Sequence, residues 1–140
     1  MKINTKIRYG LRTMIEIANA QDDNGVLQKD IAKNQNISLK YLDPIISSLK
    51  LKGLIVNYKG RRSGYRLARP VAEITMYDIY TAFEQISIVE CINNKGFCER
   101  SLHDCKANCY WTEFGRDLIK MLRSKNLEEI IRSTHFECAV

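Results

Sequence analysis

The stretch ISLKYLDPIISSLKLKGLIVNYKGRRSGYRLAR, residues 37–69, decides the fold because a helical pattern passes directly into a short hairpin. From Leu39 to about Lys52, apolar residues recur at helical spacing and form one buried stripe: Leu42, Ile45, Ile46 and Leu49. Ser38 is a suitable N-cap, and Gly53 suits the left-handed end of the helix. The remaining faces carry polar side chains that can form hydrogen bonds: Lys40, Tyr41, Asp43, Ser47 and Lys50.

A hairpin with a basic tip follows this helix. Residues 54–58 and 65–68 are typical of two short strands, and KGRRSG, residues 59–64, is a turn rich in glycine and cations. The tip side chains Lys59, Arg61 and Arg62 repel one another unless anions lie nearby. The hairpin therefore predicts a wing that lies along phosphates or inserts an arginine into a minor groove. A merely solvated turn is the alternative.

Two further helices precede the stretch. Apolar residues at helical spacing predict a helix over about residues 5–20, and a shorter one is expected over about residues 28–35. The short helix, the turn at residues 36–38 and the helix after it form a candidate helix-turn-helix, whose last helix can enter a major groove. Many helical bundles contain such a pair, so the DNA-binding interpretation depends on the wing as well.

The charge of the chain is divided unequally between its halves. Residues 1–70 hold 14 Lys and Arg against 5 Asp and Glu, a net charge of +9, whereas residues 71–140 hold 8 against 11, a net charge of −3. A basic half of this kind is a candidate for facing a polyanion, usually nucleic acid, although a solvated basic face is also possible on charge alone.

Several functional classes find no support in the sequence. No apolar run approaches the length of a membrane span, and the start lacks the apolar stretch of a signal peptide, so we expect a cytoplasmic protein with no membrane partner. The chain has no phosphate loop, no paired-carboxylate motif and no nucleophile with a matching histidine, and its only histidines are His103 and His135. We therefore expect neither an enzyme nor a small-molecule substrate.

The second half predicts a helix, a cysteine loop and a long helix. Helices are expected over about residues 74–86, 107–124 and 127–132, with a loop at 91–109 between the first two. The long helix has an apolar stripe too broad for the remaining chain to cover: Trp111, Phe114, Leu118, Met121 and Leu122. Self-association through this helix predicts a homodimer whose basic halves address adjacent half-sites, unless the stripe packs only on its own domain.

The fold class that follows is mainly α with a small β-hairpin. We expect a winged helix-turn-helix domain at residues 1–70. Residues 71–140 are expected to hold a helix, the cysteine loop, a long C-terminal dimerisation helix and a short tail.

Four of the five cysteines lie in the loop, with the spacing C-x6-C-x6-C-x3-C. Clustered thiols in a reducing compartment are more often metal ligands or redox groups than disulfides. Structural zinc sites use close cysteine pairs, and only the last two approach that spacing, whereas an iron–sulfur cluster accepts wider spacing. The candidate ligands are Cys91, Cys98, Cys105 and Cys109. Ordinary buried thiols are the alternative, and no role is assigned to Cys138.

Residues 37–69 resemble the winged helix-turn-helix of the Rrf2 family of bacterial transcription regulators, and the similarity extends over about residues 1–132, including the opening KINTKIRYGL and the cysteine loop. The resemblance implies that the third helix and the wing contact double-stranded DNA through one set of residues: Ser38, Lys40, Tyr41, Asp43, Lys59, Arg61 and Arg62. The family often has Gln where Pro44 stands and glycines where Arg62 and Ser63 stand, so the operator cannot be copied from relatives. Pro44 also predicts a bend early in the third helix.

The resemblance also implies a cofactor for the loop. Several members hold an iron–sulfur cluster on three loop cysteines, which match Cys91, Cys98 and Cys105. Members of the IscR type add a histidine three residues after the third cysteine, where this chain has Asn108, followed by Cys109. Cys109, His103 or a residue of the other subunit is therefore the expected fourth ligand, and a two-iron or a four-iron cluster remains open.

The resemblance thus implies a DNA-binding regulator that senses redox state, iron–sulfur status or nitric oxide through the cluster, which the purified protein can lack. Members of the CymR type keep the fold without a cluster, which gives one alternative. A thiol-based or metal-binding switch whose basic half meets RNA or another acidic partner is the other.

Overall fold

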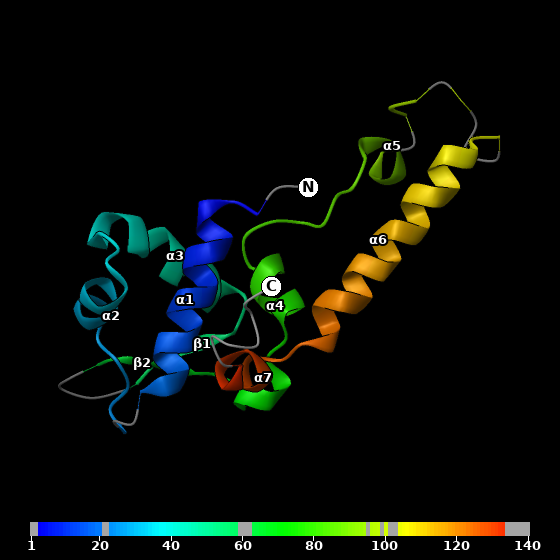
Figure 1. Ribbon diagram of the computed structural model, residues 1–140. Helices are drawn as coiled ribbons and strands as arrows, with labels where there is room; N and C mark the ends of the chain where they lie inside the picture. The colour runs from blue at the N-terminus through cyan, green and yellow to red at the C-terminus, as the bar shows by residue number, and fades with distance from the viewer. Residues whose placement is uncertain are drawn as a thin grey trace.

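The computed structural model describes residues 3–20, 23–58, 63–94, 96–98, 100 and 104–133, and confirms a mainly helical fold with one two-stranded antiparallel hairpin (Figure 1). In chain order the elements are α1 Thr5–Asn19, α2 Gln28–Gln35, α3 Leu39–Leu51, β1 Ile55–Asn57, β2 Tyr65–Leu67, η1 Val71–Glu73, α4 Met76–Thr81, α5 Glu90–Asn93, α6 Lys106–Ser124 and α7 Leu127–Arg132. The first three helices, both strands, α6 and α7 lie within two residues of the bounds expected from the sequence.

The core is built around α1, which contacts α2, α3, β2, α4 and α7. Its buried cluster draws apolar side chains from the five helices α1, α2, α3, α4 and α7, from β1 and from residues beside them, in both halves of the chain: Met14, Ile17, Ile31, Ala32, Ile37, Leu42, Ile45, Ile46, Leu49, Leu54, Ile55, Ile74, Ile79 and Leu127. Gly10 lets α1 approach the Phe83 ring closely, because a Cβ at this position would lie 2.3 Å from Phe83 Cε2. The division at residue 70 stays a prediction.

The turn between α2 and α3 has the local chemistry of a helix-turn-helix. Asn36 ends α2 in the left-handed conformation, with φ of 52°, and the Ile37 amide then donates to the Ala32 carbonyl. Ser38 caps α3 as predicted, since its Oγ accepts a hydrogen bond of 3.2 Å from the Tyr41 amide. Gly53 follows α3 with φ of +73°, which a residue with a side chain rarely adopts.

The hairpin pairs Ile55 with Leu67 and Asn57 with Tyr65. Tyr65 also forms an antiparallel bridge with Val26, in the connection before α2, through backbone hydrogen bonds of 2.8 and 3.0 Å. The start of the second strand is therefore fixed to the helix-turn-helix as well as to the first strand. The tip at residues 59–62 lies outside the described residues.

The helix expected over residues 74–86 is much shorter than predicted. Thr75 caps it through a reciprocal pair of hydrogen bonds with Asp78, but α4 ends at Thr81. Residues 84–89 are in no helix, and Ile86 and Ile88 line a hollow against α6. The β-branched side chains at 86, 88 and 89 disfavour helix. Neither η1 nor α5 was expected.

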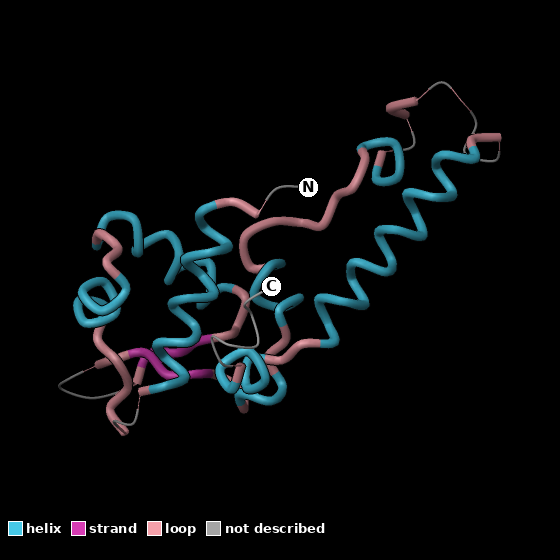
Figure 2. The backbone as a smooth tube through the Cα atoms, in the orientation of Figure 1, coloured by secondary structure: helices cyan, strands magenta, loops and turns pink. Residues whose placement is uncertain are grey.

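The long helix α6 projects away from the helical body, with α5 beside its N-terminal end and α4 and α7 near its C-terminal end (Figures 1 and 2). The chain that follows α6 is fixed to the chain just before α4: Thr75 bridges to Asn126, the Met76 amide donates to the Lys125 carbonyl at 2.9 Å, and the Leu127 amide donates to the Ile74 carbonyl at 2.7 Å. Among the described residues, no helix is long and apolar enough to cross a membrane.

One side of α6 carries exposed apolar residues. Leu118 is buried as the predicted stripe requires, but Phe114 is 43% and Met121 60% exposed. Tyr110 stacks on Phe114, with 6.4 Å between ring centroids, and extends the exposed face toward the start of the helix. The described part of the chain leaves this face uncovered.

Candidate DNA-binding surface and cysteine loop

The outward face of α3 presents the four helix residues that the sequence predicted as DNA contacts. Ser38, Lys40, Tyr41 and Asp43 are all exposed. The helical repeat also places Lys40, Pro44 and Ser47 along one ridge opposite the buried stripe. The ridge offers a cation, a hydroxyl and an apolar ring to a partner, with the Asp43 carboxylate beside it.

Pro44 does not end α3, which continues to Leu51. A proline has no amide hydrogen, so it cannot donate to the Lys40 carbonyl as another residue at position 44 would. Pro44 and Lys40 are both exposed, so solvent or a partner can satisfy this carbonyl. The proline thus changes the chemistry of the ridge while the helix persists.

Asp43 is tied to two other elements of the DNA-binding half. Its Oδ1 accepts a short hydrogen bond from Gln28 Nε2 at the first position of α2. Gln28 Oε1 in turn accepts from the Tyr65 hydroxyl of β2 at 3.3 Å. The two bonds link residues 15 and 37 positions apart, and no sequence pattern indicated them.

Side chains of α1 contact both helices of the helix-turn-helix. Arg12 Nε donates to Gln35 Oε1 at 3.0 Å, and its Nη2 donates to the Gln35 carbonyl at the end of α2. The Tyr9 ring meets Tyr41 edge to face at 5.7 Å, and the Arg12 guanidinium lies 5.2 Å from the Tyr9 ring centre. These contacts fix the N-terminal end of α3, where three of the predicted contacts lie.

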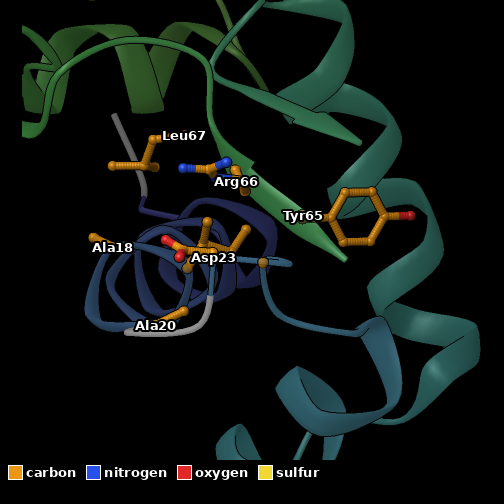
Figure 3. A pocket seen from close by; sticks show the side chains of 8 residues that line it. Ala18, Ala20, Asp23, Tyr65, Arg66 and Leu67 are labelled. Carbon is orange, nitrogen blue, oxygen red and sulfur yellow. The ribbon is translucent and has the colours of Figure 1, made fainter. Parts of the chain in front are cut away.

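The described part of the hairpin contributes one clear cation. The predicted contacts Lys59, Arg61 and Arg62 lie outside the described residues, but Arg66 is exposed on β2, with its guanidinium 5.2 Å from the Tyr58 ring centre. Arg66 also lines a hollow of about 220 Å³ between the end of α1 and β2, together with Asp23. Tyr65 lines the hollow too, and Figure 3 shows its ring pointing away from the other labelled side chains.

The loop cysteines come from three places in the fold. Cys91 lies on α5, Cys98 follows it in the loop, Cys105 immediately precedes α6, and Cys109 lies in the first turn of α6. Cys91 and Cys105 are partly buried, whereas Cys98 and Cys109 are exposed, and none of the four is in a disulfide. Within the described ranges, no three His, Cys, Asp or Glu side chains gather closely enough to hold a metal ion. His103 lies outside those ranges.

Asn108 is the side chain of α6 that faces Cys91. It is 8% exposed, its Nδ2 lies 3.8 Å from Cys91 Sγ, and its Oδ1 accepts from the Thr112 hydroxyl at 3.3 Å. Cys109 is rotated about 100° further around the helix. Sequence reasoning placed Asn108 at the position of a ligand in some relatives but did not predict its contact with Cys91, because α5 itself was not expected.

The donor types fit an iron–sulfur cluster, since thiolates are its usual ligands. Their positions fit in part: α5 lies against the start of α6, so Cys91 and Cys105 come from neighbouring elements. The described residues supply no assembled set of three.

The chain matches a family model described as "Rrf2: Iron-dependent Transcriptional regulator" over residues 3–133. It is 35% identical to the HTH-type transcriptional regulator CymR of Bacillus subtilis over 139 residues, which cover 98% of this chain and 94% of the relative. It is 28% identical to the regulator IscR of Xenorhabdus nematophila over 134 residues, which cover 95% and 80%. The solved structure of CymR, titled the global cysteine regulator of B. subtilis, superposes with a TM-score of 0.74 at 28% identity and covers 96% of this chain and 98% of that one.

Proposed function

Since this chain belongs to the Rrf2 family of transcriptional regulators, we propose that it binds specific DNA sequences as a homodimer and that an iron–sulfur cluster on its cysteine loop adjusts this binding. Its relatives are regulators rather than enzymes. The observation that carries the DNA-binding part is the exposed polar face of the capped helix α3, held beside a hairpin in the half of the chain with a net charge of +9.

In the proposed complex α3 lies in the major groove and the hairpin lies along the backbone or in the minor groove. Ser38 and Tyr41 contact the backbone, Lys40 and Asp43 reach base edges, and the wing cations Lys59, Arg61 and Arg62 neutralise phosphates. The exposed face of α6 supports a dimer, because apolar residues on a projecting helix are normally covered by a partner. Two copies then place two α3 helices in adjacent half-sites.

The cluster would be held by Cys91, Cys98 and Cys105, with Cys109 as the proposed fourth thiolate. When bound, it would supply a centre that can be oxidised or lost. Its ligands lie on α5 and at the start of α6, so a change in the loop would act on the helix that we propose joins the two subunits. A change in the distance between the two α3 helices of the dimer would then alter DNA occupancy.

A cluster-free regulator of the CymR type is the second candidate. Two observations favour it: the 35% identity to CymR, and the lack of three gathered ligands among the described residues. In that case the thiols of the loop would act directly, or not at all, in regulation.

The deciding experiment is purification of the full chain without air, followed by visible absorbance and iron and sulfide assays. Broad absorbance above 400 nm with stoichiometric iron and sulfide is expected for the cluster. A colourless, metal-free protein that still binds DNA specifically supports the cluster-free candidate. A protein that selects no fragment from its own genome, with or without air, overturns the DNA-binding proposal. Salt-dependent binding without preference among duplexes indicates the RNA or other acidic partner instead.

A further inference from the structure

We propose that Gln28 and Tyr65 are positioning residues that aim the Asp43 carboxylate at the amino group of one cytosine in each half of the DNA site. This inference rests on the proposed function and adds a base preference to it.

Hydrogen bonds join the three side chains in one series. Gln28 Nε2 donates to Asp43 Oδ1, and Gln28 Oε1 accepts from the Tyr65 hydroxyl at 3.3 Å. Both ends of the Gln28 amide are therefore used, which fixes its orientation. Tyr65 is itself held by its two backbone hydrogen bonds to Val26, only two residues before Gln28. The order is Tyr65, Gln28, Asp43, from the hairpin through α2 to α3.

These contacts leave the Asp43 side chain open to a partner. Asp43 remains exposed, and no hydrogen bond to its Oδ2 is recorded within the described ranges. A single aspartate on a solvated helix would sample several rotamers, and fixing it on binding would cost entropy. The bond from Gln28 removes much of this freedom before DNA arrives. One carboxylate oxygen is thus pre-oriented at the edge of the ridge formed by Lys40, Pro44 and Ser47.

A carboxylate in the major groove meets few hydrogen-bond donors. An ionised Asp43 can only accept hydrogen bonds, and the major-groove donors are the amino groups of cytosine and adenine. Adenine also presents the N7 acceptor beside its amino group, which repels a carboxylate, and guanine and thymine present acceptors. Cytosine is therefore the base that the fixed carboxylate favours.

The hydrogen bonds from Tyr65 through Gln28 to Asp43 also connect the hairpin to recognition of the base. Tyr65 lies on β2, so a shift of the hairpin on DNA changes the restraint on Gln28 and, through it, on Asp43. Contacts to the backbone by the wing and recognition of a base by α3 are thus coupled within one subunit.

The test uses a fragment selected from the organism's own genome, with each position of the half-site changed in turn to all four bases. Wild-type protein should prefer cytosine at one position by roughly ten-fold or more. Asp43→Asn keeps the shape of the side chain but adds a donor, so the preference at that same position should move from cytosine to adenine. Gln28→Leu should reduce the cytosine preference several-fold while binding to unrelated DNA and thermal stability stay unchanged. Tyr65→Phe should give a smaller reduction.

Gln85→Leu, the same change at an exposed residue between α4 and α5, is the matched control and should leave every base preference intact. If Asp43→Asn alters no preference, Asp43 does not read a base. If Asp43→Asn does alter it but Gln28→Leu does not, the positioning role is wrong. A wild-type protein that selects no DNA fails the proposed function itself, which is a separate outcome.

Discussion

Single side chains determine how closely the elements of this molecule approach. Gly10 is the clearest case, because an added Cβ would lie 2.3 Å from one atom of the Phe83 ring and 2.5 Å from another. Gly10→Ala should therefore lower the free energy of unfolding by about 1–3 kcal/mol through overpacking, despite the better helix propensity of alanine. Urea unfolding measures the change.

Gly96→Ala is the control for this substitution, since among the described residues its Cβ would meet only Asn94 Oδ1, at an ordinary 3.6 Å, and stability should change by less than about 0.5 kcal/mol. Equal stability of the two variants would show that the Phe83 ring moves aside without cost.

Single substitutions distinguish the proposed roles of the cysteines. Cys98→Ala should abolish retention of the cluster while circular dichroism stays native, because Cys98 is exposed and packs in no core. Cys109→Ser should lower the iron and sulfide content of protein purified without air, since it removes the proposed fourth thiolate. Cys138→Ser, which changes the cysteine outside the loop, is the matched control. Full cluster content in Cys109→Ser would assign the fourth position to another group.

Residue identity alone predicted the exposed face of α3 but not how its members are held. Ser38 could be recognised as a cap because capping acts within one turn. The Gln28 and Tyr65 contacts of Asp43, like the contact of Asn108 with Cys91, join residues that only tertiary packing brings together. Such pairs have no local signal in a single sequence.

At the scale of elements, the long amphipathic helices were predictable and the short irregular ones were not. The stripes of α1, α3 and α6 extend over three or more turns, so periodicity places them well. α4 has only 6 residues and α5 only 4, too few turns for an apolar stripe to mark their ends, and the non-helical segment between them lies against α6. The wing tip was predicted from composition, and its contacts stay a prediction.

The short helix α4 should depend strongly on its cap. Thr75 Oγ1 accepts from the Asp78 amide at 3.3 Å, and the Thr75 amide donates to Asp78 Oδ2 at 2.9 Å. Thr75→Ala removes the side-chain half of this pair and should cost about 1 kcal/mol, whereas Thr75→Ser keeps the hydroxyl and most of the stability. Thermal unfolding of the two variants checks the difference. Identical midpoints would mean that the backbone bridge to Asn126 alone fixes this helix start.

The wing can be tested as an element. Replacing both Arg61 and Arg62 with Ala should weaken binding to every duplex and make its salt dependence less steep by about two phosphate contacts. Titrations at several salt concentrations measure the slope. The double substitution of Lys120 and Arg116 with Ala, which removes the same charge from two exposed positions of α6, should leave the slope unchanged. If the Arg61 and Arg62 variant keeps the wild-type slope, the wing does not lie on phosphates.

For the molecule as a whole, the proposed dimer makes the sharpest prediction. Phe114 lies in the exposed apolar face of α6, and Phe114→Glu should convert a dimer of 16.2 kDa chains into monomers, as light scattering after gel filtration would measure. Affinity for a two-half-site fragment should fall at least about 100-fold, because the second contact would no longer be intramolecular. Lys120→Glu, at another exposed position of α6, is the control. A wild-type protein that runs as a monomer while it binds DNA fully would contradict the proposal.

The backbone bridge between Thr75 and Asn126 fixes the chain that follows α6 to the rest of the fold. Between these two positions α4 still packs on α1, and the part that projects consists of the connection after α4, α5 and α6, which returns to the body at the Thr75–Asn126 bridge. In the proposed dimer, adding or removing one turn of α6 would change the distance between the two DNA-binding halves by about 5 Å and would leave the Thr75–Asn126 bridge intact. In the proposed dimer, a chain with a shorter or longer α6 would therefore fit operators with a different spacing between half-sites.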